Sequence, residues 1–96
     1  MAIEISGDGF IVPSICHNGK FDHSVKYRWD RLMETYRGRV PLDLIIEVMT
    51  ERFGGPMMHF IPAAEERVME RVRRISGEGG VYRLRNGIVH QIYLVD

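Results

Sequence analysis

The sequence has very little cysteine: Cys16 is the only one among its 96 residues. A single thiol excludes an internal disulfide, so the chain is not a small disulfide-stapled secreted module. The first ten residues also lack the basic start and the long apolar run that are typical of a secretory signal. We therefore expect a protein of the reducing cytoplasm.

The sequence also lacks a net charge and a long apolar run. Thirteen Lys and Arg residues are balanced by thirteen Asp and Glu residues. Such a chain has no general attraction to nucleic acid or to an anionic membrane, so any such binding would need a local patch of charge. The apolar run at residues 44–46 is far too short to cross a bilayer, and we expect no membrane partner.

The first half of the chain predicts a strand pair followed by two helices. Ile3 and Ile5 alternate with polar residues, Asp8-Gly9 offers a turn, and residues 10–12 are apolar, which predicts an N-terminal β-hairpin. Apolar residues at helical spacing predict helices from Ser24, as N-cap, to residue 36 and over about residues 41–53. Only a few residues separate these two predicted helices, and so short a link favours an antiparallel helix pair.

The second half predicts a short strand, a third helix and a second hairpin. Residues 57–61 favour a strand, and Pro62 can open a helix whose buried stripe runs to residue 75. Asn86-Gly87 predicts a tight turn between residues 81–85 and 88–95, with Leu84 opposite Val89 and Arg83 opposite His90. The whole chain, residues 1–96, is predicted to form a single α+β domain.

The second predicted helix and the strand after it carry an unusually wide apolar surface. Only Asp43, Glu47, Thr50 and Glu51 mark a polar side of this helix. One small core does not need so much apolar area, and flexible methionines suit an adaptable interface. We therefore expect a homodimer. The predicted interface residues are Leu42, Ile46, Met49, Phe53, Met57, Met58 and Phe60.

Cys16, His17 and His23 lie close together in the sequence, and His59 or His90 could complete a metal site. Zinc sites usually take their ligands in short fixed pairs, whereas Cys16 and His17 are adjacent and chelate one ion poorly. Nothing near Cys16 indicates an activated nucleophile either. Solvated loop side chains are the favoured interpretation over a metal site, and no cofactor is predicted.

Arginines recur between residues 67 and 85, and glutamates are interleaved with them. A solvated, ion-paired helix face is the favoured interpretation, and a contact with nucleic acid is the alternative. Such a contact would be salt-dependent and largely indifferent to sequence. Its candidate residues are Arg73, Arg74, Arg83 and Arg85.

Residues 42–75 resemble the dimerisation region of the Mor/C transcription activators of Mu-like phages. The matching features are the apolar helix ending at Phe53, the Gly54-Gly55 break, the strand ending in Phe60-Ile61-Pro62 and the apolar helix beyond it. The resemblance implies that helix and strand pack against those of a second chain, with the strand near DNA.

The chain departs from that family in two ways. The spacer between Gly55 and Pro62 is one residue longer, and the chain continues into the Asn86-Gly87 hairpin where the family continues into a helix-turn-helix. We therefore expect a phage- or prophage-type regulatory protein that dimerises and binds a protein partner, with DNA as the second choice.

Residues 29–55 also resemble the opening of soluble lytic transglycosylase domains, whose catalytic glutamate precedes a Ser-Gly pair at the end of an apolar helix. Here Arg52 takes the place of the glutamate and Phe53 that of the serine, so the general acid is missing. Glu47 and Glu51 are the remaining carboxylates beside the apolar face. A non-catalytic protein is therefore the main prediction, and a degenerate or minimal cell-wall hydrolase is the alternative.

Overall fold

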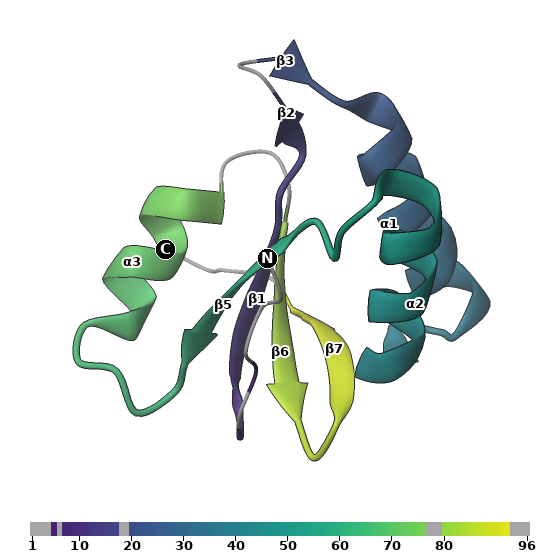
Figure 1. Ribbon diagram of the computed structural model, residues 1–96. Helices are drawn as coiled ribbons and strands as arrows, with labels where there is room; N and C mark the ends of the chain where they lie inside the picture. Colours follow the sequence, from purple (N-terminus) through teal and green to yellow (C-terminus); the bar gives the residue numbers. More distant parts are fainter. Residues whose placement is uncertain (1–4, 6, 18–19, 77–79, 93–96) are drawn as a thin grey trace.

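A five-stranded antiparallel sheet lies at the centre of the protein (Figure 1). The computed structural model describes residues 5, 7–17, 20–76 and 80–92. The strands are ordered β4-β7-β6-β1-β5, and β2 and β3 form a separate two-stranded ladder. Their bounds are β1 Gly9–Pro13, β2 Cys16–His17, β3 Lys20–Phe21, β4 Arg39–Pro41, β5 Met58–Pro62, β6 Val81–Arg85 and β7 Ile88–Ile92.

Helices cover both faces of this sheet (Figure 1). On one side lie α1 (His23–Thr35) and α2 (Leu42–Phe53), and on the other lies α3 (Val68–Ser76). The combination of helices with an antiparallel sheet confirms the predicted α+β class. Among the residues that the structure describes, no helix is both long and apolar enough to span a membrane.

The two sides of the sheet bury separate sets of apolar side chains. The larger core joins Trp29 of α1 and Ile45 and Met49 of α2 to residues on one face of the sheet. The smaller core joins Val72 of α3 to the opposite face. Because side chains alternate along a strand, β1 contributes to both cores and all five of its residues are buried. This explains why its sequence is a continuous apolar run.

The C-terminal hairpin is confirmed in its predicted register. Leu84 pairs with Val89 and Arg83 pairs with His90 between β6 and β7. Asn86 and Gly87 both have positive φ, 52° and 76°, as a type I′ turn requires. The Asn-Gly pair therefore fixes which side chains of β6 and β7 share a face.

The N-terminal hairpin prediction is wrong for the arm that the structure describes. β1 pairs with β5 along one edge and with β6 along the other, so neither edge is free for a preceding strand. Residues 3, 4 and 6 of the expected first arm lie outside the described residues. A strand that is apolar on both faces belongs inside a sheet that is covered on both sides, as β1 is, between β6 and β5.

Three boundaries also differ from the prediction. Asp22, and not Ser24, caps α1, since its Oδ1 accepts the amide of Ser24 at 2.9 Å. The link between α1 and α2 holds β4, which pairs with β7. The third helix begins at Val68, because Pro62 ends β5 and residues 63–67 form turns, with Arg67 at φ 60°.

Candidate functional site

One half of the sheet face on the α3 side is left open. The helix α3 packs over β1 and β5, where Val72 meets Phe10, Val12 and Ile61. The strands β4, β7 and β6 lie beyond it, and apart from Val81, which is buried in the smaller core, their side chains on this face are exposed or half-buried. We call the α3-side face of β4, β7 and β6 the open half of the sheet.

Strand register places six side chains on the open half in two rows. Their strand neighbours Val40, Leu84 and Val89 point into the core of α1 and α2, so alternation directs these six to the other side. The first row runs Arg39, His90, Arg83 and the second runs Pro41, Ile88, Arg85 across β4, β7 and β6.

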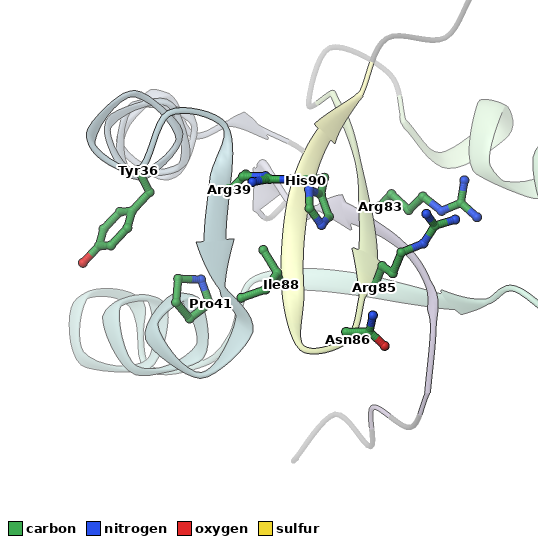
Figure 2. A pocket seen from close by; sticks show the side chains of 8 residues that line it. All are labelled: Tyr36, Arg39, Pro41, Arg83, Arg85, Asn86, Ile88 and His90. Carbon is green, nitrogen blue, oxygen red and sulfur yellow. The ribbon is translucent and has the colours of Figure 1, made fainter.

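These six residues line a hollow together with Tyr36 and Asn86 (Figure 2). Tyr36, the C-cap residue of α1, lies beyond β4. Arg83 and Arg85 lie at the opposite end, on β6, and Ile88 lies between (Figure 2). Asn86 belongs to the turn between β6 and β7. The hollow therefore has a tyrosine at one end and two arginines at the other.

The hollow is cationic although the chain has no net charge. None of the five strands, as the structure describes them, contains an Asp or a Glu. The ion pairs among the described residues lie elsewhere: Lys26–Asp30, Arg67–Glu70 and Arg71–Glu65. Within the described part of the chain, Arg39, Arg83 and Arg85 have no such partner. Their charges are therefore available to an anion from outside.

Two contacts hold the β6 end of the hollow in place. The Cζ atom of Arg83 lies 5.8 Å from the centroid of the Phe10 ring on β1, a cation–π geometry that orients the guanidinium. The Oδ1 atom of Asp8 accepts the amide of Asn86 at 3.2 Å, which ties the hairpin turn to the start of β1. The Asp8 carboxylate, which lies close to this end of the hollow, therefore stabilises the turn through this hydrogen bond.

Comparisons give no relative from which a function could be transferred. No family model matches the chain, and neither curated proteins nor solved structures give a match. The resemblance of residues 42–75 to the Mor/C activators stays a prediction. The candidate site is therefore argued from its own geometry.

The structure separates the four arginines predicted to contact nucleic acid. Arg83 and Arg85 line the hollow, whereas Arg73 and Arg74 are exposed on α3. Arg74 lies in a mixed cluster of charges with Glu65, Glu66, Arg67, Glu70 and Arg71. Arg74 therefore lies among carboxylates, two of which pair with Arg67 and Arg71 of the same cluster, whereas no carboxylate of the described residues lines the hollow around Arg83 and Arg85.

Sequence reasoning missed Arg39 and Tyr36 as members of the site. The predicted hairpin already placed His90 opposite Arg83. The sequence did not indicate that this pair belongs to a binding surface. Arg39 reaches the same row because β4 pairs with β7, aligning Arg39 with His90. A three-residue strand between two helices leaves no periodic signal, so only the folded chain shows this contact.

The residues of the predicted dimer interface lie in or against the chain's own core. Met49 and Met58 are buried within it, at 0% and 3% exposure. The remaining five are partly buried and pack against the same core: Leu42, Ile46, Phe53, Met57 and Phe60. The homodimer stays a prediction.

The predicted metal and acid candidates are not brought together. No three potential ligands among His, Cys, Asp and Glu form a metal-binding group within the described residues. His59 and His90 lie on β5 and β7, which β6 and β1 separate. The side chains of Cys16 and His17 lie outside the described part. Glu47 and Glu51 are exposed on α2 and so lack the apolar surroundings that suit a general acid.

Proposed function

We propose that this protein is a small, non-catalytic binding module that holds an anionic partner against the open half of its sheet. One observation carries the proposal: Arg39, Arg83 and Arg85, all exposed and unpaired among the described residues, converge with His90 on one hollow. Guanidinium groups bind phosphate and carboxylate oxygens through paired hydrogen bonds. Three of them on one surface favour a partner with several anionic groups.

Binding is favoured over catalysis by the side chains of the hollow. Its lining offers arginine, histidine, tyrosine and asparagine, with proline and isoleucine beside them. A hydrolase of the lytic type needs a carboxyl group as general acid, and none of these lining residues supplies one. The lining suits recognition of charge and of an apolar or aromatic surface.

The distribution of charge also favours a polyanion. Zero net charge was the sequence argument for a protein partner, but the acidic residues of the described chain lie on helices, turns and loops and not on the sheet. Asp43, Glu47 and Glu51, for example, lie on α2, across the sheet from the hollow. A polyanion can therefore approach the open half without meeting the carboxylates of α2.

The Mor/C resemblance supports a wider role within this proposal. A phage- or prophage-type regulator would work in the cytoplasm, dimerise through its helix-strand segment and contact DNA or a protein of the transcription machinery. The open half of the sheet would then be the contacting surface, since the strands β6 and β7 stand where that family continues into a helix-turn-helix.

Matched charge variants test the proposal by fluorescence anisotropy. The wild-type chain should bind labelled polyanions, tried as a 20-nucleotide strand, a 20-base-pair duplex and poly-glutamate, more weakly as salt rises. For a strand held by three arginines the slope of log K against log salt should be about −2. Combining Arg39→Ala, Arg83→Ala and Arg85→Ala should weaken binding by at least about 100-fold, on the order of 1 kcal/mol per arginine.

The control removes three positive charges on and next to α3 by combining Arg67→Ala, Arg71→Ala and Arg74→Ala. It changes the net charge equally but touches the mixed cluster and not the hollow. We expect it to keep an affinity within a few-fold of wild type. An equal loss in both triple variants, with both still folded by circular dichroism, would contradict the proposal, as would no binding of any polyanion.

A further inference from the structure

We propose that the anionic partner of the open half is a single-stranded nucleic acid, with phosphates along the arginines and a base against the apolar end of the hollow. This inference rests on the proposed function and adds the chemical class of the ligand. It comes from the way that charged and apolar side chains divide the hollow between them.

The hollow has a charged part and an apolar part. Arg39, His90 and Arg83 form one row across three strands, and Arg85 continues the charge along β6. Pro41 and Ile88 are paired on β4 and β7 and occupy the corner that these four residues enclose. The three arginines and His90 therefore border an apolar patch on two sides.

Tyr36 adds an aromatic ring to the apolar end. It is 41% exposed and is one of two large hydrophobic side chains that the structure shows as exposed. Its position is fixed by the end of α1, where its amide donates to the carbonyl of Leu32 at 3.1 Å. In Figure 2 it lies on the same side of the hollow as Pro41, away from Arg83 and Arg85. An exposed ring beside arginines offers a base a surface for stacking.

The spacing of the cationic groups suits a flexible phosphate chain. Neighbouring strands are about 4.8 Å apart, so the backbones of Arg39 and Arg83 are roughly 10 Å apart. Arg83 and Arg85 are two residues apart on one strand, a rise of about 6.6 Å. Long arginine side chains can adjust from these anchor points to successive phosphates, as a single strand presents them.

A duplex would match the charged part of the hollow but not the apolar part. Its bases are stacked inside the helix, so the surface that it offers is mainly phosphate and sugar. Groove reading needs a helix or a protruding ribbon, whereas the helix on this face, α3, lies over β1 and β5. Unstacked bases of a single strand can pack on aromatic and apolar side chains. The Pro41, Ile88 and Tyr36 surface therefore favours a single strand.

An acidic peptide would also satisfy the arginines, since carboxylates pair with guanidinium groups as phosphates do. A peptide rich in Asp or Glu has no flat ring to place on Tyr36. The tyrosine is thus the residue that distinguishes the candidate ligands, and the arginines are the residues that all of them would share.

The test compares four labelled probes by fluorescence anisotropy at about 50 mM salt, where electrostatic binding is strong. The probes are a 20-nucleotide thymidine strand, the same length of uridine strand, a 20-base-pair duplex and poly-glutamate. We expect at least one single strand to bind about 10-fold or more tightly than the duplex or poly-glutamate. Tyr36→Ala should weaken the strand by about 5- to 100-fold, the range of base stacking on one aromatic residue.

Two variants serve as controls. Tyr36→Phe keeps the ring and should bind the strand within about two-fold of wild type. Tyr27→Ala removes the other tyrosine that is exposed among the described residues; it is 58% exposed and lies outside this hollow, beside His23 and Arg28. It should leave all four affinities unchanged, because its ring does not line the hollow.

The outcomes separate this inference from the proposed function. A duplex or poly-glutamate bound as tightly as the strands, or a Tyr36→Ala effect equal for every probe, would overturn the single-strand assignment and leave the arginine site standing. If no probe binds through Arg39, Arg83 and Arg85, both the single-strand assignment and the proposed arginine site are overturned. Loss of strand binding alone in Tyr36→Ala, with the duplex unaffected, supports both.

Discussion

Replacing Trp29 with alanine should lower the free energy of unfolding by about 3–5 kcal/mol, the usual cost of truncating a buried tryptophan. Trp29 is 1% exposed, and its ring stacks on Tyr82 with centroids 5.0 Å apart and an interplanar angle of 27°. The pair joins α1 to β6, the strand that carries Arg83 and Arg85. Urea unfolding followed by circular dichroism measures the change through the denaturation midpoint.

The matched control is Trp29→Phe. The indole Nε1 is buried and has no hydrogen-bond partner among the described residues, so its removal breaks no hydrogen bond. Phenylalanine keeps an aromatic ring against Tyr82 and loses volume only. We expect it to cost less than half as much as Trp29→Ala. An alanine variant that unfolds within about 1 kcal/mol of wild type would show that this contact does not anchor α1 to the sheet.

Gly9→Ala should cost about 3 kcal/mol, near the upper end for overpacking a tight site. A Cβ atom at Gly9 would lie 2.5 Å from the carbonyl oxygen of Ile61 and 2.6 Å from the ring of Phe60. The ring could rotate away, but the carbonyl belongs to the neighbouring strand β5, so β1 and β5 would have to separate. Thermal or urea unfolding measures the loss.

Gly55→Ala is the control for that substitution. An added Cβ at Gly55 meets nothing within 4 Å, so we expect a change of a few tenths of a kcal/mol at most. Both variants add the same methyl group, and they differ only in the space around the new Cβ atom. Equal stability in both would mean that β1 and β5 do not approach as closely as the structure shows.

The parts of the fold that the sequence predicted are those fixed by local chemistry. Asn86-Gly87 sets the register of β6 and β7, and with it the placement of Arg83 opposite His90. The apolar spacing around Trp29 located α1 within a residue or two. Such features depend on neighbours in the chain, and these neighbours determine them whatever the rest of the molecule does.

The parts that the sequence did not predict depend on contacts between distant segments. β1 pairs with β5 and β6, some 50 and 70 residues later, and nothing in the run Gly9–Pro13 names those partners. β4 has only three residues, so its pairing with β7 could not be read from periodicity. Arg83 and Arg85 were therefore visible in the sequence as candidate site residues, while the places of Arg39 and Tyr36 needed the folded chain.

Net charge is a poor guide to the charge of this surface for a physical reason. A sum over the chain treats Arg71, which pairs with Glu65, like Arg85, which has no ion pair among the described residues. Among the described residues, the helices hold most of the acidic side chains and the sheet holds none, so a neutral chain carries a cationic face. The location of the charges, and not their total, decides which ligand the surface can bind.

The most direct test of the cationic open half is to observe the arginines themselves. In nuclear magnetic resonance spectra of the ¹⁵N-labelled chain, the side-chain Nε–Hε signals of individual arginines can be followed as the 20-nucleotide thymidine strand is added. We predict that the signals of Arg39, Arg83 and Arg85 shift on binding and that those of Arg67, Arg71 and Arg74 stay in place. Shifts confined to Arg67, Arg71 and Arg74, or no shifts at saturating strand, would contradict the assignment of the open half as the binding surface.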